Sequence, residues 1–210
     1  MNLIFNFGAA AAATLAVLLG FQPWARADQI YFTPRQVLAE FFPKSEKVTF
    51  VKVTPDPRRL ARIKQRLGYL PSKPTYTFYV AKTAGQVDGY AFVDDELGQH
   101  LPITYAVKLD WTGKVQDLAI MVYRESRGDE IRDARFRKQF TGKTGSDKVR
   151  LNQDVVAISG ATISSNSMAI GVRRAVVLFD ECMASPATAG KATGTPANHA
   201  VPPASATQAR

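Results

Sequence analysis

Apolar and polar residues alternate along several stretches of the chain, and this alternation predicts strands. Turn-forming residues lie between these stretches, at Ala84-Gly85 and at Trp111-Thr112-Gly113. Such short loops join antiparallel neighbours, so the pattern predicts hairpins and a meander and not βαβ units. The expected strands span residues 48–53, 75–81, 89–93, 104–109 and 115–123.

Apolar residues spaced three and four apart predict the helices. The clearest pattern covers 164–179, and shorter helices are expected at 34–42, at 58–67 and within the charged stretch 130–140. The helix at 58–67 is basic and amphipathic, which suits packing against a sheet or lying on a membrane surface, and we favour packing. The expected fold class is α+β: a mainly antiparallel sheet with flanking helices, in a single domain over residues 28–183.

The two ends of the chain differ from this domain in composition. Residues 1–27 contain an apolar run from Gly8 to Phe21 and end in Ala25-Arg26-Ala27, which predicts a signal peptide cut before Asp28. A retained N-terminal membrane anchor is the alternative. Either one places the domain in the periplasm or on the extracytoplasmic face of the membrane. Residues 184–210 are rich in Ala, Pro and Thr, and we expect a disordered tail.

Composition narrows the possible chemistry. The net charge is +9, but the basic residues are interleaved with acidic ones, and the sequence contains no nucleic-acid-binding motif. We therefore expect a solvated basic surface and no nucleic-acid partner. Cys182 is the only cysteine, and His100 and His199 are the only histidines. These counts argue against a disulfide, a cysteine-ligated cluster, a multi-histidine metal site and a Ser-His-Asp triad. A redox centre in this chain is therefore expected to be organic.

The segment Ser159-Gly160-Ala161-Thr162 lies directly before the last predicted helix. One interpretation is a helix start, in which the glycine makes a turn and hydroxyl groups cap unpaired N–H groups. The other is a phosphate site, because a glycine turn at a helix N-terminus favours anions. A hydroxyl there can hold phosphate by a hydrogen bond or as an ester, and local geometry does not distinguish the two.

These residues resemble the S/T-G-A-T motif of the FMN-binding domain family. The family occurs in the C and G subunits of sodium-pumping NADH:quinone reductase and Rnf complexes, and in nitrous-oxide-reduction regulatory proteins. The similarity extends over about residues 41–178 and includes the Asp110-to-Val115 hairpin and the stretch Gln139-to-Lys143. It implies that a separate flavin transferase attaches FMN as a phosphodiester to Thr162. The other cofactor-binding residues that it implies are Ser159, Gly160, Ala161, Ser164, Ser165 and Glu125.

The chain departs from the family pattern before the motif. Val156 stands where the family usually has Asp, and Asp154 lies two residues upstream, so both covalent and noncovalent FMN stay open. The expected function is an extracytoplasmic electron-transfer flavoprotein. It would be an electron carrier or redox subunit of membrane or periplasmic proteins and not a stand-alone enzyme. The alternatives are a noncovalent flavin-binding sensory or assembly module of a membrane respiratory system, and a structural domain whose motif only caps a helix.

Other residues have two interpretations each. Glu125 is either a residue at the flavin rim or part of a solvated ion pair with an arginine. Gln139 and Phe140 either contact the flavin ring or belong to the fold, and we expect Phe140 in the core. Arg173 and Arg174 lie more than two turns beyond Thr162 and are expected to be surface cations.

Overall fold

The computed structural model describes residues 28–184, so the predicted leader and nearly all of the predicted tail lie outside the described residues. Its centre is a six-stranded antiparallel sheet with the order β1-β6-β5-β4-β3-β2. The strands are β1 (Gln29–Ile30), β2 (Lys47–Val53), β3 (Tyr76–Thr83), β4 (Gln86–Leu97), β5 (Pro102–Leu109) and β6 (Val115–Tyr123).

The predicted meander is confirmed. Strands β2 to β6 are neighbours in sequence order, and Ala84 and Gly85 form the turn between β3 and β4. Strand β4 is longer than predicted. Its last part, Asp94-Asp95-Glu96, pairs with β5 throughout, but it was not predicted because these acidic residues do not alternate with apolar ones. The short strand β1 was not predicted, since two residues carry no periodicity; it pairs with the free edge of β6.

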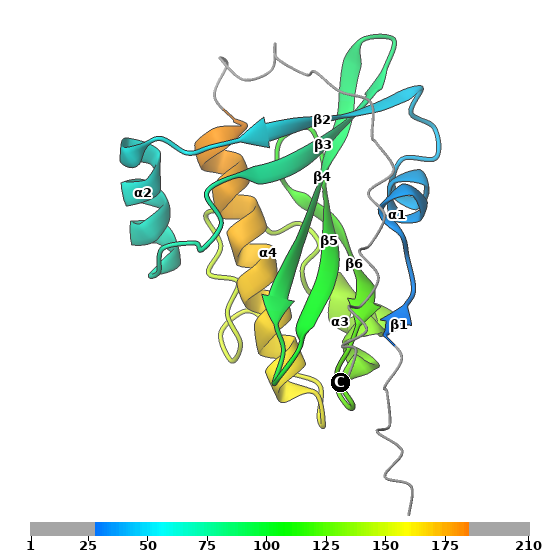
Figure 1. The fold of residues 1–210 in the computed structure, drawn as a ribbon, viewed down its shortest axis with the longest axis vertical. Coiled ribbons are helices and arrows are strands. Elements are labelled where there is room, and N and C mark those ends of the chain that lie inside the picture. Colours follow the sequence, from blue (N-terminus) through cyan, green and yellow to red (C-terminus); the bar gives the residue numbers. More distant parts are fainter. Residues whose placement is uncertain (1–27, 185–210) are drawn as a thin grey trace, which may run out of the picture.

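Helices cover both faces of the sheet (Figure 1). Helix α4 (Thr162–Cys182) packs on one face, where its buried residues share a core with Tyr105, Val107 and Leu118. Helix α1 (Pro34–Phe41) packs on the other face, where alanines such as Ala106 leave room for it. The fold is thus α+β, as expected, and α4 is the element that carries the motif.

Helix α2 (Pro57–Leu67) packs beside α4 (Figure 1). Its apolar residues Ile63 and Leu67 are buried in the same core as α4, and Arg66 bridges to Asp180 and Glu181 of α4. The apolar stripe of this basic helix is therefore used inside the protein, and the membrane-surface alternative for that stripe is wrong.

The single helix expected within 130–140 is broken in two. A 3₁₀ helix, η1 (Asp129–Arg132), is followed by α3 (Ala134–Lys138). The break lies at Asp133, whose carboxylate accepts a hydrogen bond from the Arg135 N–H at 2.7 Å and so caps α3. An N-capping residue needs non-helical backbone angles, which interrupts the helix at this point.

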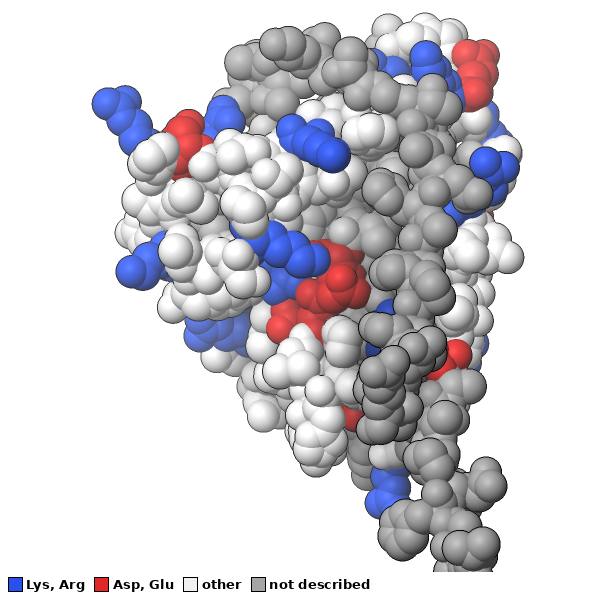
Figure 2. Space-filling model, in the orientation of Figure 1, with Lys and Arg blue, Asp and Glu red and all other residues white. Residues whose placement is uncertain are grey.

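Charged side chains are distributed unevenly on the surface. Figure 2 shows acidic side chains gathered near the middle of one face, with basic side chains spread around them. Within residues 28–184, no helix has the length and apolar character needed to cross a membrane.

Candidate functional site

Helix α4 begins at Thr162, and its N-terminus has no side-chain cap. Ala161 occupies the N-cap position, and no side chain among the described residues accepts a hydrogen bond there. The interpretation of the motif as hydroxyl caps is therefore wrong. Uncapped N–H groups of a first helical turn, together with the helix dipole, favour an anion.

The turn before the helix leaves open space beside the backbone. The Ala161 N–H donates to the Ile158 carbonyl at 3.0 Å, and Gly160 takes a φ of +83°, a conformation that favours glycine. A Cβ on Gly160 would meet no atom within 4 Å. Ser159, Gly160 and Thr162 are exposed. The turn thus exposes its backbone and the Thr162 hydroxyl to a ligand, and this arrangement fits a phosphate group.

The hydroxyl pair after the motif points into the protein. Ser164 is buried, and its Oγ lies 2.8 Å from the Tyr123 hydroxyl. Ser165 is also buried, and its Oγ accepts from the Ile158 N–H at 3.2 Å. Both side chains therefore position the first turn of α4. Their predicted contact with the cofactor stays a prediction.

Tyr123 and Gly128 complete this support, and the sequence did not reveal either of them. The Tyr123 hydroxyl also donates to the Arg127 carbonyl at 2.5 Å, so it ties the end of β6 to α4. A Cβ on Gly128 would lie 2.6 Å from the Ser164 Oγ and 2.8 Å from the Tyr123 hydroxyl. Only glycine fits there without displacing the start of α4.

Glu125 binds the turn between β4 and β5. Its side chain is buried and accepts hydrogen bonds from the N–H groups of His100 and Leu101, the latter at 2.8 Å. Burial opposes its ionisation, but these N–H donors outweigh burial and lower the pKa of Glu125. The alternative of a solvated ion pair with an arginine is wrong, because the buried Glu125 carboxylate accepts hydrogen bonds from backbone N–H groups instead.

Gln139 and Asp154 hold the loop that precedes the motif. The Gln139 amide donates to the Val156 carbonyl at 3.1 Å and accepts from its N–H at 2.8 Å, while the Val156 side chain is 70% exposed. Asp154 accepts from the N–H groups of Val149 and Arg150 at 2.9 and 2.7 Å. It also pairs with Lys143 at 3.0 Å. Phe140 is fully buried, which confirms its place in the core.

A cavity of about 330 Å³ lies along α4. The α4 residues that line it follow Thr162 at helical spacing, so Thr162 lies on the same face of the helix, one turn before the cavity. The cavity was not predicted, because its walls come from three separate segments. Its lining consists of Leu67, Tyr69, Val149, Arg150, Leu151, Asn166, Ala169, Ile170 and Arg173.

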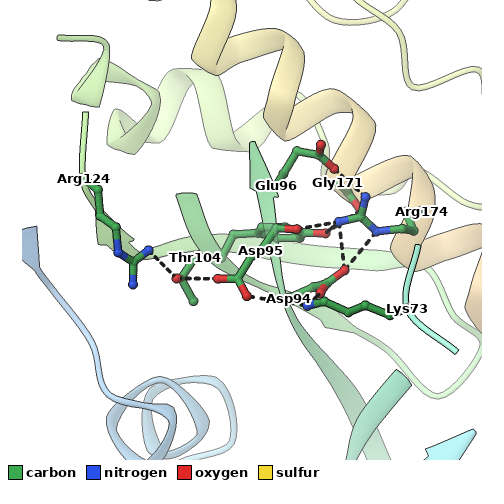
Figure 3. A network of polar contacts seen from close by, with 9 residues as sticks. Lys73, Asp94, Asp95, Glu96, Thr104, Arg124, Gly171 and Arg174 are labelled. Carbon is green, nitrogen blue, oxygen red and sulfur yellow. Dashed lines mark hydrogen bonds and ion pairs between the residues drawn. The ribbon is translucent and has the colours of Figure 1, made fainter. Parts of the chain in front are cut away.

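Arg174 is not a surface cation, contrary to the prediction. It is buried between α4 and β4, where it pairs with Asp94 at 2.8 Å and with Glu96 (Figure 3). It also donates to the Tyr105 hydroxyl at 3.1 Å, and Lys73 pairs with Asp94 from the other side. The acidic partners come from β4, far away in the sequence, so local charge gave no indication of this network.

Cys182 is buried at the end of α4, and burial raises the pKa of its thiol to about 11. A thiol with so high a pKa stays protonated near neutral pH and is a poor nucleophile. Between residues 28 and 184, no group of His, Cys, Asp and Glu side chains could hold a metal ion.

A comparison with protein families adds information on the region that contains the motif. Residues 98–177 match the model of the FMN-binding domain family, and this range contains Glu125 and the whole motif up to Thr162 and Ser165. The chain contains an FMN-binding domain. FMN is accordingly its cofactor, and the uncapped start of α4 lies inside the matched range. The match covers less than half of the chain, and β2, β3 and both outer helices α1 and α2 precede it.

Among solved structures, the chain is similar to a subunit of the Na⁺-translocating NADH-quinone reductase from Parabacteroides distasonis. The two share 17% sequence identity with a TM-score of 0.40, over 69% of this chain and 84% of that one. No curated protein sequence matches the chain.

Proposed function

We propose that this protein is an extracytoplasmic electron-transfer flavoprotein whose FMN is joined through its phosphate to the Thr162 hydroxyl. The observation that carries the proposal is the exposed Thr162 at an uncapped helix N-terminus, inside the region that matches the FMN-binding domain family. Bound FMN supplies the redox chemistry, because its ring takes up and releases electrons. The predicted leader at 1–27 supports export, and a flavin transferase would load the cofactor.

Each part of the site has a definite task in this proposal. The N–H groups of Thr162, Ile163 and Ser164 have no intrahelical partner and no side-chain cap, and they stabilise the phosphate. Gly160 keeps the adjacent backbone accessible. Attachment forms one bond between the Thr162 Oγ1 and phosphorus, the hydroxyl proton leaves, and the activating group of the FMN donor departs.

Exposed apolar side chains near this end of α4 support contact with a protein partner. Ile163 is 50% exposed, and Leu97 and Leu101 at the β4–β5 turn are 61% and 43% exposed. The Ser167 hydroxyl donates to the Leu97 carbonyl at 2.6 Å, which places this turn beside the first turns of α4. Apolar residues gathered at a surface site indicate a contact area for another molecule. Electron transfer needs such proximity between partners.

Noncovalent FMN is the second candidate. It is favoured by the exposed Val156 side chain, which stands where a transferase that requires Asp would meet an apolar group. The same helix N-terminus would then hold the phosphate of the cofactor without an ester bond. A sensory or assembly module of a membrane respiratory system fits this form of binding.

Co-expression with a flavin transferase tests the attachment. After denaturing gel electrophoresis, the wild-type band should be fluorescent and the Thr162→Ala band dark, because only the wild type retains the ester. Thr141→Ala is the matched control, since Thr141 is an exposed threonine outside the motif. It should fluoresce like the wild type. Val156→Asp should increase the attached fraction.

A fluorescent Thr162→Ala band would refute the assignment of the ester. A dark wild-type band from a protein that is yellow in its native state would favour the noncovalent form. Rapid reduction and reoxidation by a membrane fraction would separate an electron carrier from a sensory module, because only the carrier needs to exchange electrons at a steady rate.

A further inference from the structure

The two edges of the sheet differ, and the β6 edge is covered along its length. Strand β1 pairs with the last two residues of β6, and the Met121 carbonyl accepts from the N–H groups that follow β1. Arg137 donates to the Leu118 carbonyl at 2.9 Å. Residues 142–143 exchange two backbone hydrogen bonds with Val115, each of 2.8 Å. Another strand therefore cannot pair along this edge.

The β2 edge is open (Figure 1). Strand β2 pairs with β3 over all of its 7 residues, without a register shift. On its other side, no hydrogen bond from any residue in the range 28–184 reaches its backbone. The strand contains no proline, glycine or acidic residue, and Lys47 and Lys52 are its only charged residues. Such an edge presents a row of unpaired N–H and C=O groups, which can pair with another extended chain.

The sequence of β2 fits a second copy of itself. Two antiparallel copies overlap over the full strand only when Phe50 lies opposite Phe50. In that register, Lys47 lies opposite Val53 of the second copy, and Val48 lies opposite Lys52. No lysine faces another lysine, so the repulsion of like charges across strands is avoided. Each lysine can instead pack its methylene groups against a valine.

The side chains on the two faces of β2 also match in this register. Phe50 is half-buried, and it lies opposite Tyr79 of β3. Thr49 and Val51 are buried on the other face. The Phe50 rings of two copies meet at a two-fold axis, and cross-strand aromatic pairs stabilise sheets. A strand that complements itself about one axis suits a symmetric dimer.

We infer that two copies of this protein associate through their β2 strands, antiparallel and centred on Phe50, so that two six-stranded sheets form one continuous sheet. The contacts between Val48 and Lys52 fix the register. The dimer is independent of the flavin, because β2 precedes both the motif and the range 98–177 that matches the family model.

Engineered cysteines test the register in the full chain, which is kept in a mild detergent because its N-terminus is apolar. Phe50→Cys should give a disulfide-linked dimer on mild oxidation, because the Cα atoms of opposite residues lie about 4.5–5.5 Å apart. A mixture of Val48→Cys and Lys52→Cys chains should also be linked. Each of these two alone should stay monomeric, because its cysteines would be offset by four residues, or roughly 14 Å.

Thr141→Cys is the matched control, because Thr141 is exposed and lies outside β2. It should stay monomeric on the same non-reducing gel. The native Cys182 is buried and should form no link between chains.

Charge substitutions at Val48 test the same register without a cross-link. Val48→Glu places a carboxylate opposite Lys52 twice in each dimer, and it should lower the dissociation constant several-fold in sedimentation velocity. Val48→Lys should raise the dissociation constant several-fold. Both variants lose the same apolar side chain, so lost packing does not explain opposite effects. High salt should reduce the difference, and urea unfolding verifies that both variants are folded.

The inference is overturned if Phe50→Cys is linked no better than Thr141→Cys. It is also overturned if Val48→Glu and Val48→Lys associate with equal affinity. Hydrogen exchange at the β2 N–H groups that slows as the protein concentration rises would support the dimer. Slow exchange in a protein that stays monomeric would mean that another segment of the same chain covers this edge, which would refute the inference.

Discussion

Glu125 shows how a single side chain can stabilise a distant turn. Its carboxylate accepts the N–H groups of His100 and Leu101, which lie in the turn between β4 and β5. Glu125→Ala leaves both donors without this acceptor. We expect a loss of about 1–3 kcal/mol in the free energy of unfolding, because the turn loses two hydrogen bonds to a charged acceptor.

Urea unfolding measures this loss. Glu130→Ala is the control, because Glu130 is exposed and a substitution there should change the stability by less than about 0.5 kcal/mol. Equal stabilities of the two variants would show that the Glu125 hydrogen bonds contribute nothing.

At single residues, the sequence correctly placed Thr162 at the start of a helix, whereas the prediction that Arg174 is a surface cation is wrong. Thr162 belongs to a local motif at a helix start, and local motifs are contained in a few consecutive residues. Arg174 is buried and forms ion pairs with Asp94 and Glu96, which lie on β4. The residues next to Arg174 in the sequence give no indication of these two partners. The hydrogen bond between Tyr123 and Ser164 was also not predicted, because the two residues are far apart in the sequence.

At the scale of elements, the loop before the motif depends on one carboxylate. Burial opposes ionisation of Asp154, but the Arg150 N–H, the Lys143 ammonium and the Val149 N–H outweigh it and lower the pKa of Asp154. A lowered pKa in the folded state stabilises the protein above the unfolded value of about 3.9. This contribution is lost as the pH falls through the folded pKa.

Asp154→Asn should therefore destabilise the protein at pH 7 by about 1 kcal/mol, a modest value because solvent screens the partly exposed side chain. The difference between variant and wild type should shrink below pH 4. Urea midpoints at pH 7 and pH 3 check the expectation. A difference that is equal at both pH values would contradict it.

Most helices and strands could be predicted where the periodic pattern of apolar residues extends over many positions. Alternation located β2 to β6, and helical spacing located α1, α2 and α4. The exceptions are instructive. The strand β1 is too short to show a period, and the capping of α3 by Asp133 broke one predicted helix into two. The cavity could not be predicted, because α2, the loop near Val149 and α4 meet only in three dimensions.

At the scale of the whole molecule, the sheet separates two cores. One core contains α4 and the motif, and the other contains α1 with Val37, Leu38 and Phe41 against Ala106. Ala106→Leu should overfill the second core and destabilise the protein by about 1–3 kcal/mol, because close-packed interiors do not accept extra methyl groups. Flavin attachment should be unchanged, since the sheet lies between.

Urea unfolding and gel fluorescence on the same preparation check both expectations for Ala106→Leu. A stable variant with reduced fluorescence would contradict the separation of the two cores.

The uncapped start of α4 has a consequence for the maturation of the protein. Before the cofactor arrives, the first turn of this helix lacks the hydrogen bonds that a capping group would supply. If FMN binds through its phosphate at Thr162, as we propose, the phosphate supplies them, and loading with FMN and ordering of this turn are then thermodynamically linked. Whatever stabilises the turn increases the affinity for the cofactor, and the cofactor in turn stabilises the turn. In the proposed form of binding, the flavin would therefore complete the first turn of α4 in its own protein.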